Sequence, residues 1–93
     1  MHYTYVLFCK HSSQSGKIFY VGSTDNLENR LQQHRSKNVL TTKNFDIIEL
    51  AYYEVCVNKT DARKRELQLK TGFGRGYINK RIENYLRELD KRG

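Results

Sequence analysis

The sequence contains no proline, and no part of it is a low-complexity tract, an internal repeat or a visible linker. A chain of 93 residues is long enough for one modest hydrophobic core and too short for two. These features together predict a single domain over residues 1–93. Its hydrophobic share of 38% and charged share of 29% are typical of an ordinary globular domain.

Long hydrophobic runs are also missing, since none approaches the roughly 18 apolar residues that a membrane-spanning helix needs. The segment from Met1 to Thr4 lacks the pattern of a signal peptide. The two cysteines, Cys9 and Cys56, lie in apolar, strand-like segments, which favours buried, reduced thiols over a disulfide framework. We therefore predict a cytoplasmic protein that has no membrane partner.

Acidic residues are fewer than basic ones. The chain has 10 Asp and Glu and 17 Lys and Arg, which gives a net charge of +7. A cationic surface gains free energy by releasing the counterions that are condensed on phosphates. Charge alone is a weak signal, since many basic domains bind no nucleic acid. It makes a nucleic acid one candidate partner.

Aromatic and β-branched residues are concentrated in three segments, which we interpret as strands: residues 3–9, 17–22 and 47–57. The first two segments flank a polar turn at residues 11–16 and are expected to form a hairpin. One register that this turn permits places Tyr5 directly opposite Tyr20. A slip of one residue would move one of these tyrosines to the other face of the sheet.

Helices are expected in three segments, at residues 25–36, 60–71 and 75–90. The segment from Ser23 to Asp25 supplies N-cap oxygens for the first helix, and Gly72 ends the second. We interpret the glycine-rich run at 72–76 as a helix cap and turn, because a dinucleotide-binding loop would follow a strand. The order ββαβαα predicts an α+β fold, in which three helices flank a small, mainly antiparallel, three-stranded sheet.

Two polar features of these helices do not fit a purely structural role. Asn26, Arg30 and His34 follow one another at four-residue steps and form a stripe beside the apolar residues of the first helix. The alternative is a solvated face that ends in a histidine favoured by the helix dipole. Glu66 lies at the edge of an apolar stripe, where a carboxylate is unfavourable unless it is paired or bound to a metal ion. The alternative there is an ion pair with Lys70, one turn later.

The segment from Phe19 to His34 resembles the second signature block of the GIY-YIG nuclease superfamily. In that block a Tyr-Ile/Val-Gly strand end is followed by an arginine ten residues after the tyrosine and a histidine four residues later. The positions that match this spacing are Tyr20, Gly22, Arg30 and His34. Four matches in the correct order make this block the most specific part of the resemblance.

The first signature block is less exact, because the segment from Tyr3 to Leu7 stands where Gly-Ile-Tyr is expected. The tyrosine is kept as Tyr5, but the glycine is not. Small stand-alone members of the family often have Tyr-Val-Tyr at this point. Further similarity is found at residues 41–44, 51–54, 62–70 and 72–81, so that the resemblance extends from residue 3 to about residue 82.

The resemblance implies an endonuclease that hydrolyses phosphodiester bonds in DNA with one divalent ion, Mg²⁺ or Mn²⁺. Glu66 is the only protein ligand implied for that ion, and Arg30 is implied to clamp the scissile phosphate. Tyr5 is the implied general base, while Tyr20 and His34 orient the water and the phosphate or share the proton. A free tyrosine has a pKa near 10 and is a poor base at pH 7, unless Arg30 and the metal ion lower that pKa. His34, with an ordinary pKa near 6.5, is a rival base.

Basic side chains and one glycine are expected to contact the nucleic-acid backbone without reading its sequence; these residues are Gly22, Lys43, Arg63, Arg65, Arg75, Lys80 and Arg81. No recognition module is visible in the sequence. Specificity is therefore expected to come from the shape of the DNA, from a homodimer or from a partner protein. The alternative to a nuclease is a catalytically inactive nucleic-acid-binding or interaction module of the same fold.

Overall fold

The computed structural model describes residues 1–13 and 16–91. Strands β1 (His2–Lys10), β2 (Lys17–Thr24) and β3 (Ile47–Cys56) form one antiparallel sheet in the order β2-β1-β3. Residues 4–9 of the central strand are all buried, because helices cover both faces of the sheet there. Residues 14–15 of the predicted turn, and residues 92–93, lie outside the described part of the chain.

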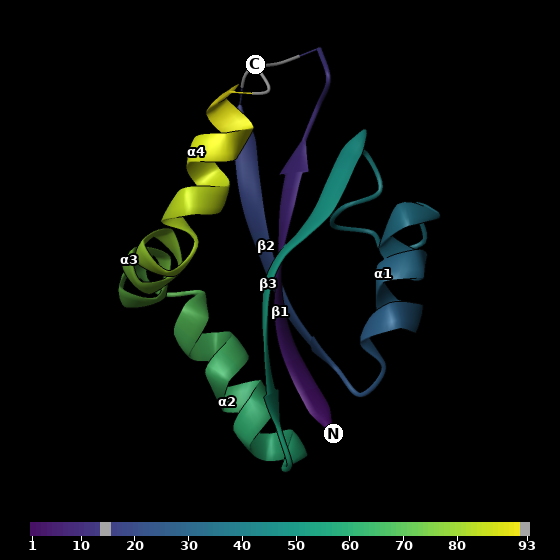
Figure 1. The fold of residues 1–93 in the computed structure, drawn as a ribbon. Coiled ribbons are helices and arrows are strands. Elements are labelled where there is room, and N and C mark those ends of the chain that lie inside the picture. The colour runs from purple at the N-terminus through teal and green to yellow at the C-terminus, as the bar shows by residue number, and fades with distance from the viewer. Residues whose placement is uncertain (14–15, 92–93) are drawn as a thin grey trace.

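The helices in the described residues are α1 (Leu27–Arg35), α2 (Lys59–Leu69), α3 (Gly72–Arg81) and α4 (Glu83–Lys91). Helix α1 covers one face of the sheet, while α2, α3 and α4 cover the opposite face (Figure 1). The predicted α+β class and antiparallel sheet are confirmed. Among the described residues, no helix combines the length and the apolar character that crossing a membrane requires.

The single helix predicted at residues 75–90 is instead two helices, which meet at Ile82. The apolar stripe gave no sign of this break, because the same core receives Ile78 before the joint and Ile82 at it, and Tyr85 and Leu86 pack against it from α4. The run at 72–76, predicted as a cap and turn, is the start of α3. There, Gly74 packs so closely on the end of α2 that a Cβ would collide with the backbone of Leu69.

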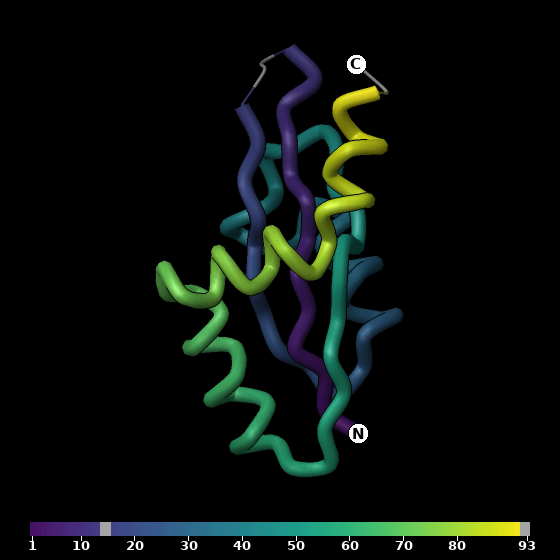
Figure 2. Tube along the Cα trace, turned by 60° about the vertical axis from the view of Figure 1, so that its left-hand side comes forward, coloured from purple at the N-terminus to yellow at the C-terminus, as the bar shows by residue number. Residues whose placement is uncertain are grey.

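Helix α3 crosses the sheet from the β2 edge toward β3, and α4 then turns to run along the strands (Figure 2). The core under these helices is formed by Val6, Val21, Leu69, Ile78 and Ile82. A second core lies on the α1 face of the sheet. It buries Cys9, and this burial raises the pKa of the Cys9 thiol to about 11.

The register of the hairpin differs from the direct Tyr5–Tyr20 pairing considered above. Tyr5 lies opposite Gly22, and Tyr20 lies opposite Leu7. This register differs from the direct pairing by two positions, and a shift of two keeps both tyrosines on the same face of the sheet. Their rings therefore lie diagonally, with centroids 6.3 Å apart.

Candidate active site

The hydroxyl of Tyr5 is the centre of a polar cluster between the sheet and α1. Tyr5 Oη lies 2.9 Å from His34 Nε2 and accepts a hydrogen bond of 3.3 Å from Arg30 Nε. Tyr5 itself is buried, with 1% of its surface exposed. The two partners stand one turn apart on α1, so that one helix face brings both to the same phenol.

The position of the Tyr5 ring depends on Gly22, which faces it across the hairpin. A Cβ at residue 22 would stand 2.5 Å from Tyr5 Oη and 2.6 Å from Tyr5 Cζ. Because atoms cannot approach so closely, only glycine leaves room for the phenol here. Gly22 is buried, and this geometry gives it a packing role beside Tyr5; its expected backbone contact to nucleic acid stays a prediction.

His34 is completely buried, which excludes the alternative of a solvated histidine at the end of the helix. Its Nδ1 lies 2.7 Å from the hydroxyl oxygen of Thr42, in the loop after α1. Burial, helped by the positive charge of Arg30, lowers the pKa of His34 to about 4. The imidazole is therefore neutral at pH 7. One ring nitrogen donates a hydrogen bond through its single N–H, and the other ring nitrogen accepts one.

The pKa of Tyr5 is raised, because burial outweighs the lowering effect of the hydrogen bond from Arg30. The negative charge of Glu66 also contributes to raising it. The hydrogen bond from Arg30 lowers this pKa, as expected, but burial has the larger effect. Tyr5 is therefore a neutral phenol at pH 7 in this environment.

Arg30 and Tyr20 form the half-buried side of the cluster. The ring of Tyr20 meets the imidazole of His34 nearly edge-on, with centroids 5.1 Å apart. Arg30 Nη1 donates a 2.9 Å hydrogen bond to Gln33 Oε1. Hydrogen bonding to Tyr5 raises the pKa of Arg30, and Tyr20 contributes in the same direction. The guanidinium therefore stays charged beside both phenols.

Glu66 stands on α2, behind the opposite face of the sheet, with 8% of its surface exposed. Its Oε1 accepts a 2.6 Å hydrogen bond from Ser23 Oγ, and its Oε2 pairs with Lys70 Nζ at 2.8 Å. Burial alone would raise the pKa of Glu66, but Lys70 and Ser23 together lower it. The ion pair with Lys70 does form, and the carboxylate is ionised at pH 7.

Comparison with known proteins shows which family this arrangement belongs to. Residues 1–81 match the model of the GIY-YIG catalytic domain. The chain belongs to the GIY-YIG family. A GIY-YIG domain implies nuclease activity on nucleic acid, and nucleases of this family generally use divalent metal ions.

Relatives with detectable similarity are UPF0213 proteins. One from Staphylococcus haemolyticus is 36% identical over 83 residues, which are 88% of this chain and 94% of the relative. One from Oceanobacillus iheyensis is 36% identical over 70 residues, which are 74% of this chain and 76% of the relative. No solved structure matches the chain.

The metal ion that a GIY-YIG nuclease generally uses would have few protein ligands here. Among the described residues, no group of three or more His, Cys, Asp and Glu could hold a metal ion. Glu66 is ionised, and its Oε2 pairs with Lys70, whose side chain is 48% exposed. This geometry fits a Mg²⁺-like ion that takes one carboxylate oxygen and otherwise binds water and substrate oxygens.

The basic residues expected to bind nucleic acid in this GIY-YIG domain do not share one surface. Arg65 is held in the fold, because its guanidinium donates two 2.9 Å hydrogen bonds to Glu54 and lies 4.7 Å from the ring centre of Tyr77. Arg75 lines a pocket beside β2, and Arg63 lines a second pocket next to Ser23. The remaining cations are exposed: Lys80 and Arg81 lie at the end of α3, and Lys43 lies in the loop after α1, next to Thr42.

Sequence analysis missed two side chains that hold the site together. Thr42 fixes the ring of His34, and Ser23 holds Glu66. Lys70, the other partner of Glu66, was considered from the sequence as its ion-pair partner, and this pair forms. The resemblance of residues 41–44 to the family is the one feature of the sequence that could have pointed to Thr42. Ser23 gave none, because a serine before a helix is normally interpreted as an N-cap.

Proposed function

We propose that this chain is a metal-dependent endonuclease that hydrolyses phosphodiester bonds in DNA. The catalytic residues of this proposal are Tyr5, Tyr20, Arg30, His34 and Glu66. The observation that carries it is the contact of Tyr5 Oη with both His34 Nε2 and Arg30 Nε, at 2.9 and 3.3 Å. A phenol held between a neutral imidazole and a guanidinium is placed to move a proton beside a bound phosphate.

In this proposal the attacking water gives its proton to Tyr5 Oη while the phenol proton passes to His34 Nε2. His34 is 0% exposed and so reaches the water only through Tyr5. The tautomer required has its proton on Nδ1, from where it donates to Thr42 Oγ1 at 2.7 Å. The water oxygen bonds to phosphorus, the bond from phosphorus to the leaving oxygen breaks, and solvent protonates that oxygen.

Arg30 binds the scissile phosphate, since a planar guanidinium matches phosphate oxygens well. The bound phosphate also offsets the positive charge of Arg30, which contributes to the low pKa of His34. Substrate binding therefore makes His34 a better proton acceptor. Tyr20, half-buried on the edge strand, orients the water and the phosphate from the open side of the cluster.

Glu66 would hold the divalent ion, Mg²⁺ or Mn²⁺, with Ser23 fixing the carboxylate; Lys70 would have to leave Oε2 for the ion to bind there. The ion, when bound, supplies positive charge for the leaving oxygen and for the transition state. Of the basic residues outside the cluster, Arg63 and Arg75 are the backbone contacts nearest to Glu66 and Tyr20. Arg65 is left out of the proposed contacts because Glu54 occupies it.

Supercoiled plasmid incubated with the protein and Mg²⁺ or Mn²⁺ tests the proposal. We expect nicking that EDTA abolishes. Glu66→Gln should reduce it by at least about 10²-fold while DNA binding is retained, and Glu88→Gln, on the exposed surface of α4, should leave it unchanged. Nicking that persists in EDTA would contradict the assignment of Glu66 as metal ligand.

An inactive nucleic-acid-binding module is the alternative, and the ion pair that covers Glu66 favours it. With Lys70 Nζ 2.8 Å from Oε2 and Ser23 Oγ 2.6 Å from Oε1, both oxygens of Glu66 already have partners. Binding of plasmid without nicking at any concentration of Mg²⁺ or Mn²⁺ would establish this alternative. A homodimer or a partner protein would then be the source of function.

A further inference from the structure

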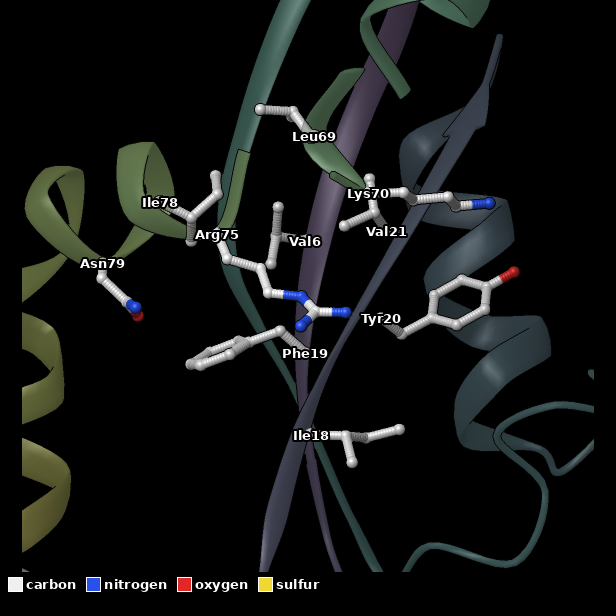
Figure 3. Close-up of a pocket in the computed structure, with 10 residues that line it drawn as sticks. All are labelled: Val6, Ile18, Phe19, Tyr20, Val21, Leu69, Lys70, Arg75, Ile78 and Asn79. Carbon is white, nitrogen blue, oxygen red and sulfur yellow. The ribbon is translucent and has the colours of Figure 1, made fainter. Parts of the chain in front are cut away.

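A pocket of about 250 Å³ lies between the edge strand β2 and the start of α3 (Figure 3). None of the described residues that line it is acidic. Its floor is apolar and its rim carries two cations; the floor is formed by Val6, Phe19, Val21 and Ile78, and the cations are Lys70 and Arg75. A site of this composition attracts a ligand that combines a flat apolar part with an anion.

Arg75 lines this pocket, and its side chain is not used to hold the fold together. Its guanidinium has no hydrogen-bond or ion-pair partner in the described part of the chain, and it reaches from α3 across the apolar floor toward β2 (Figure 3). A guanidinium so placed can donate two parallel hydrogen bonds to a phosphate, or stack on a flat ring.

The pocket adjoins the candidate active site through two shared residues. Tyr20 lines the pocket and packs edge-on against His34, at 5.1 Å between ring centres. Lys70 lines the pocket and pairs with Glu66 at 2.8 Å. The Tyr20 hydroxyl and the Lys70 amino group point to the same side in Figure 3. A ligand in the pocket therefore lies next to the place where the proposed function puts the scissile phosphate.

We propose that this pocket binds one unpaired nucleotide of the DNA strand, beside the scissile phosphate, with its base on the apolar floor and its phosphate on Arg75. This inference rests on the proposed function, which supplies the position of the neighbouring phosphate. The pocket is smaller than those that hold drug-sized ligands, so it admits one base and not a base pair. A base in a duplex must leave its stack to enter, and this is easiest where the base is already unpaired. DNA with an unpaired base at this position is the preferred substrate.

Binding without turnover tests the pocket by itself. The probe is a short fluorescein-labelled oligothymidylate, titrated with the protein in EDTA and followed by fluorescence anisotropy. We expect Arg75→Ala to weaken binding by about tenfold, which is typical of losing a base-stacking or phosphate contact in such sites. Arg87→Ala removes the same charge from the exposed surface of α4 and should have a much smaller effect. Equal losses in the two variants, or tighter binding of the matching duplex, would overturn the inference.

Cleavage of single-stranded DNA that carries one abasic position, moved stepwise past the cleaved bond, gives a second test. One position should slow the wild-type protein by about tenfold and slow Arg75→Ala much less, because that variant has already lost the contact. Cleavage that is indifferent to every abasic position would reject the pocket while leaving the nuclease intact. Binding that depends on Arg75 in a protein that never cleaves would reject the nuclease and keep the pocket.

Discussion

Gly22 lies directly against the phenol of Tyr5, and a Cβ on residue 22 would stand 2.5 Å from the Tyr5 hydroxyl oxygen. The strand pair thus sets the height of the phenol above the sheet, and α1 supplies its two hydrogen-bond partners. The geometry on which the proposed chemistry depends is therefore sensitive to a single methyl group on the strand next to Tyr5.

Gly22→Ala is expected to displace the Tyr5 ring and break its hydrogen bonds to His34 and Arg30. We expect the rate of metal-dependent nicking to fall by about 10²-fold, as misplacement of a reacting group by about 1 Å commonly does. Rates of plasmid nicking and melting temperatures measure the effect. Gly76→Ala is the control, since a Cβ at Gly76 in α3 meets nothing within 4 Å and alanine favours a helix. It should keep full activity and melt slightly higher.

His34 is expected to make the stability of the fold depend on pH. Its folded-state pKa of about 4 lies below the ordinary value of 6.5, so the unfolded chain binds the extra proton first as pH falls. The contribution is fully present above pH 6.5 and is lost between pH 6.5 and about 4, amounting to roughly 3 kcal/mol. Urea denaturation at a series of pH values measures it.

The control for this pH dependence is His2→Gln, which should keep the slope because His2 lies outside the cluster. His34→Gln should flatten the curve between pH 6.5 and 5, although it lowers stability at neutral pH by removing two buried hydrogen bonds. An unchanged slope in His34→Gln would show that another group is responsible for the titration.

Ser23 is expected to act on metal binding through Glu66, because its hydroxyl donates a 2.6 Å hydrogen bond to Oε1. Ser23→Ala should raise the Mn²⁺ concentration needed for half-maximal nicking by about tenfold, with the maximal rate largely recovered at saturating metal. Glu66→Gln should not recover at any Mn²⁺ concentration. Ser36→Ala, which loses only an exposed bond to the backbone of Gln32, serves as the control. A fall in maximal rate with no change in the metal requirement would contradict this positioning role.

Arg65 is expected to stabilise the fold and to leave DNA cleavage alone. Arg65→Ala removes a two-bond ion pair with Glu54 and a contact with the ring of Tyr77, which together contribute roughly 1 kcal/mol at this partly buried site. Urea denaturation and plasmid nicking separate the two effects. Arg63→Ala, by contrast, should weaken DNA binding with little change in stability. Loss of DNA affinity in Arg65→Ala at unchanged stability would show that the side chain leaves Glu54 to bind phosphate.

The strands could be predicted from the sequence because aromatic and β-branched residues mark them directly, as in the buried run from Thr4 to Cys9. The break at Ile82 could not, because the apolar stripe follows the shared core and continues across the joint between α3 and α4. The hairpin register could not be predicted from the sequence either. Turn composition favoured the direct Tyr5–Tyr20 pairing or a slip of one residue, whereas the adopted register differs by two positions and places Tyr5 against Gly22.

The sequence by itself determined the chemical inventory of this protein: tyrosines on two strands, Arg30 and His34 one turn apart on a helix, and a lone acid at Glu66. These features follow from spacing along the chain, because helix and strand geometry place residues at fixed intervals on the same face. Only the tertiary structure decided that His34 is neutral at pH 7, that the pKa of Tyr5 is raised above that of a free tyrosine, and that Arg65 is bound to Glu54. Burial, charge and hydrogen-bond partners set these properties, and they arise from residues that meet only when the sheet and its helices have packed.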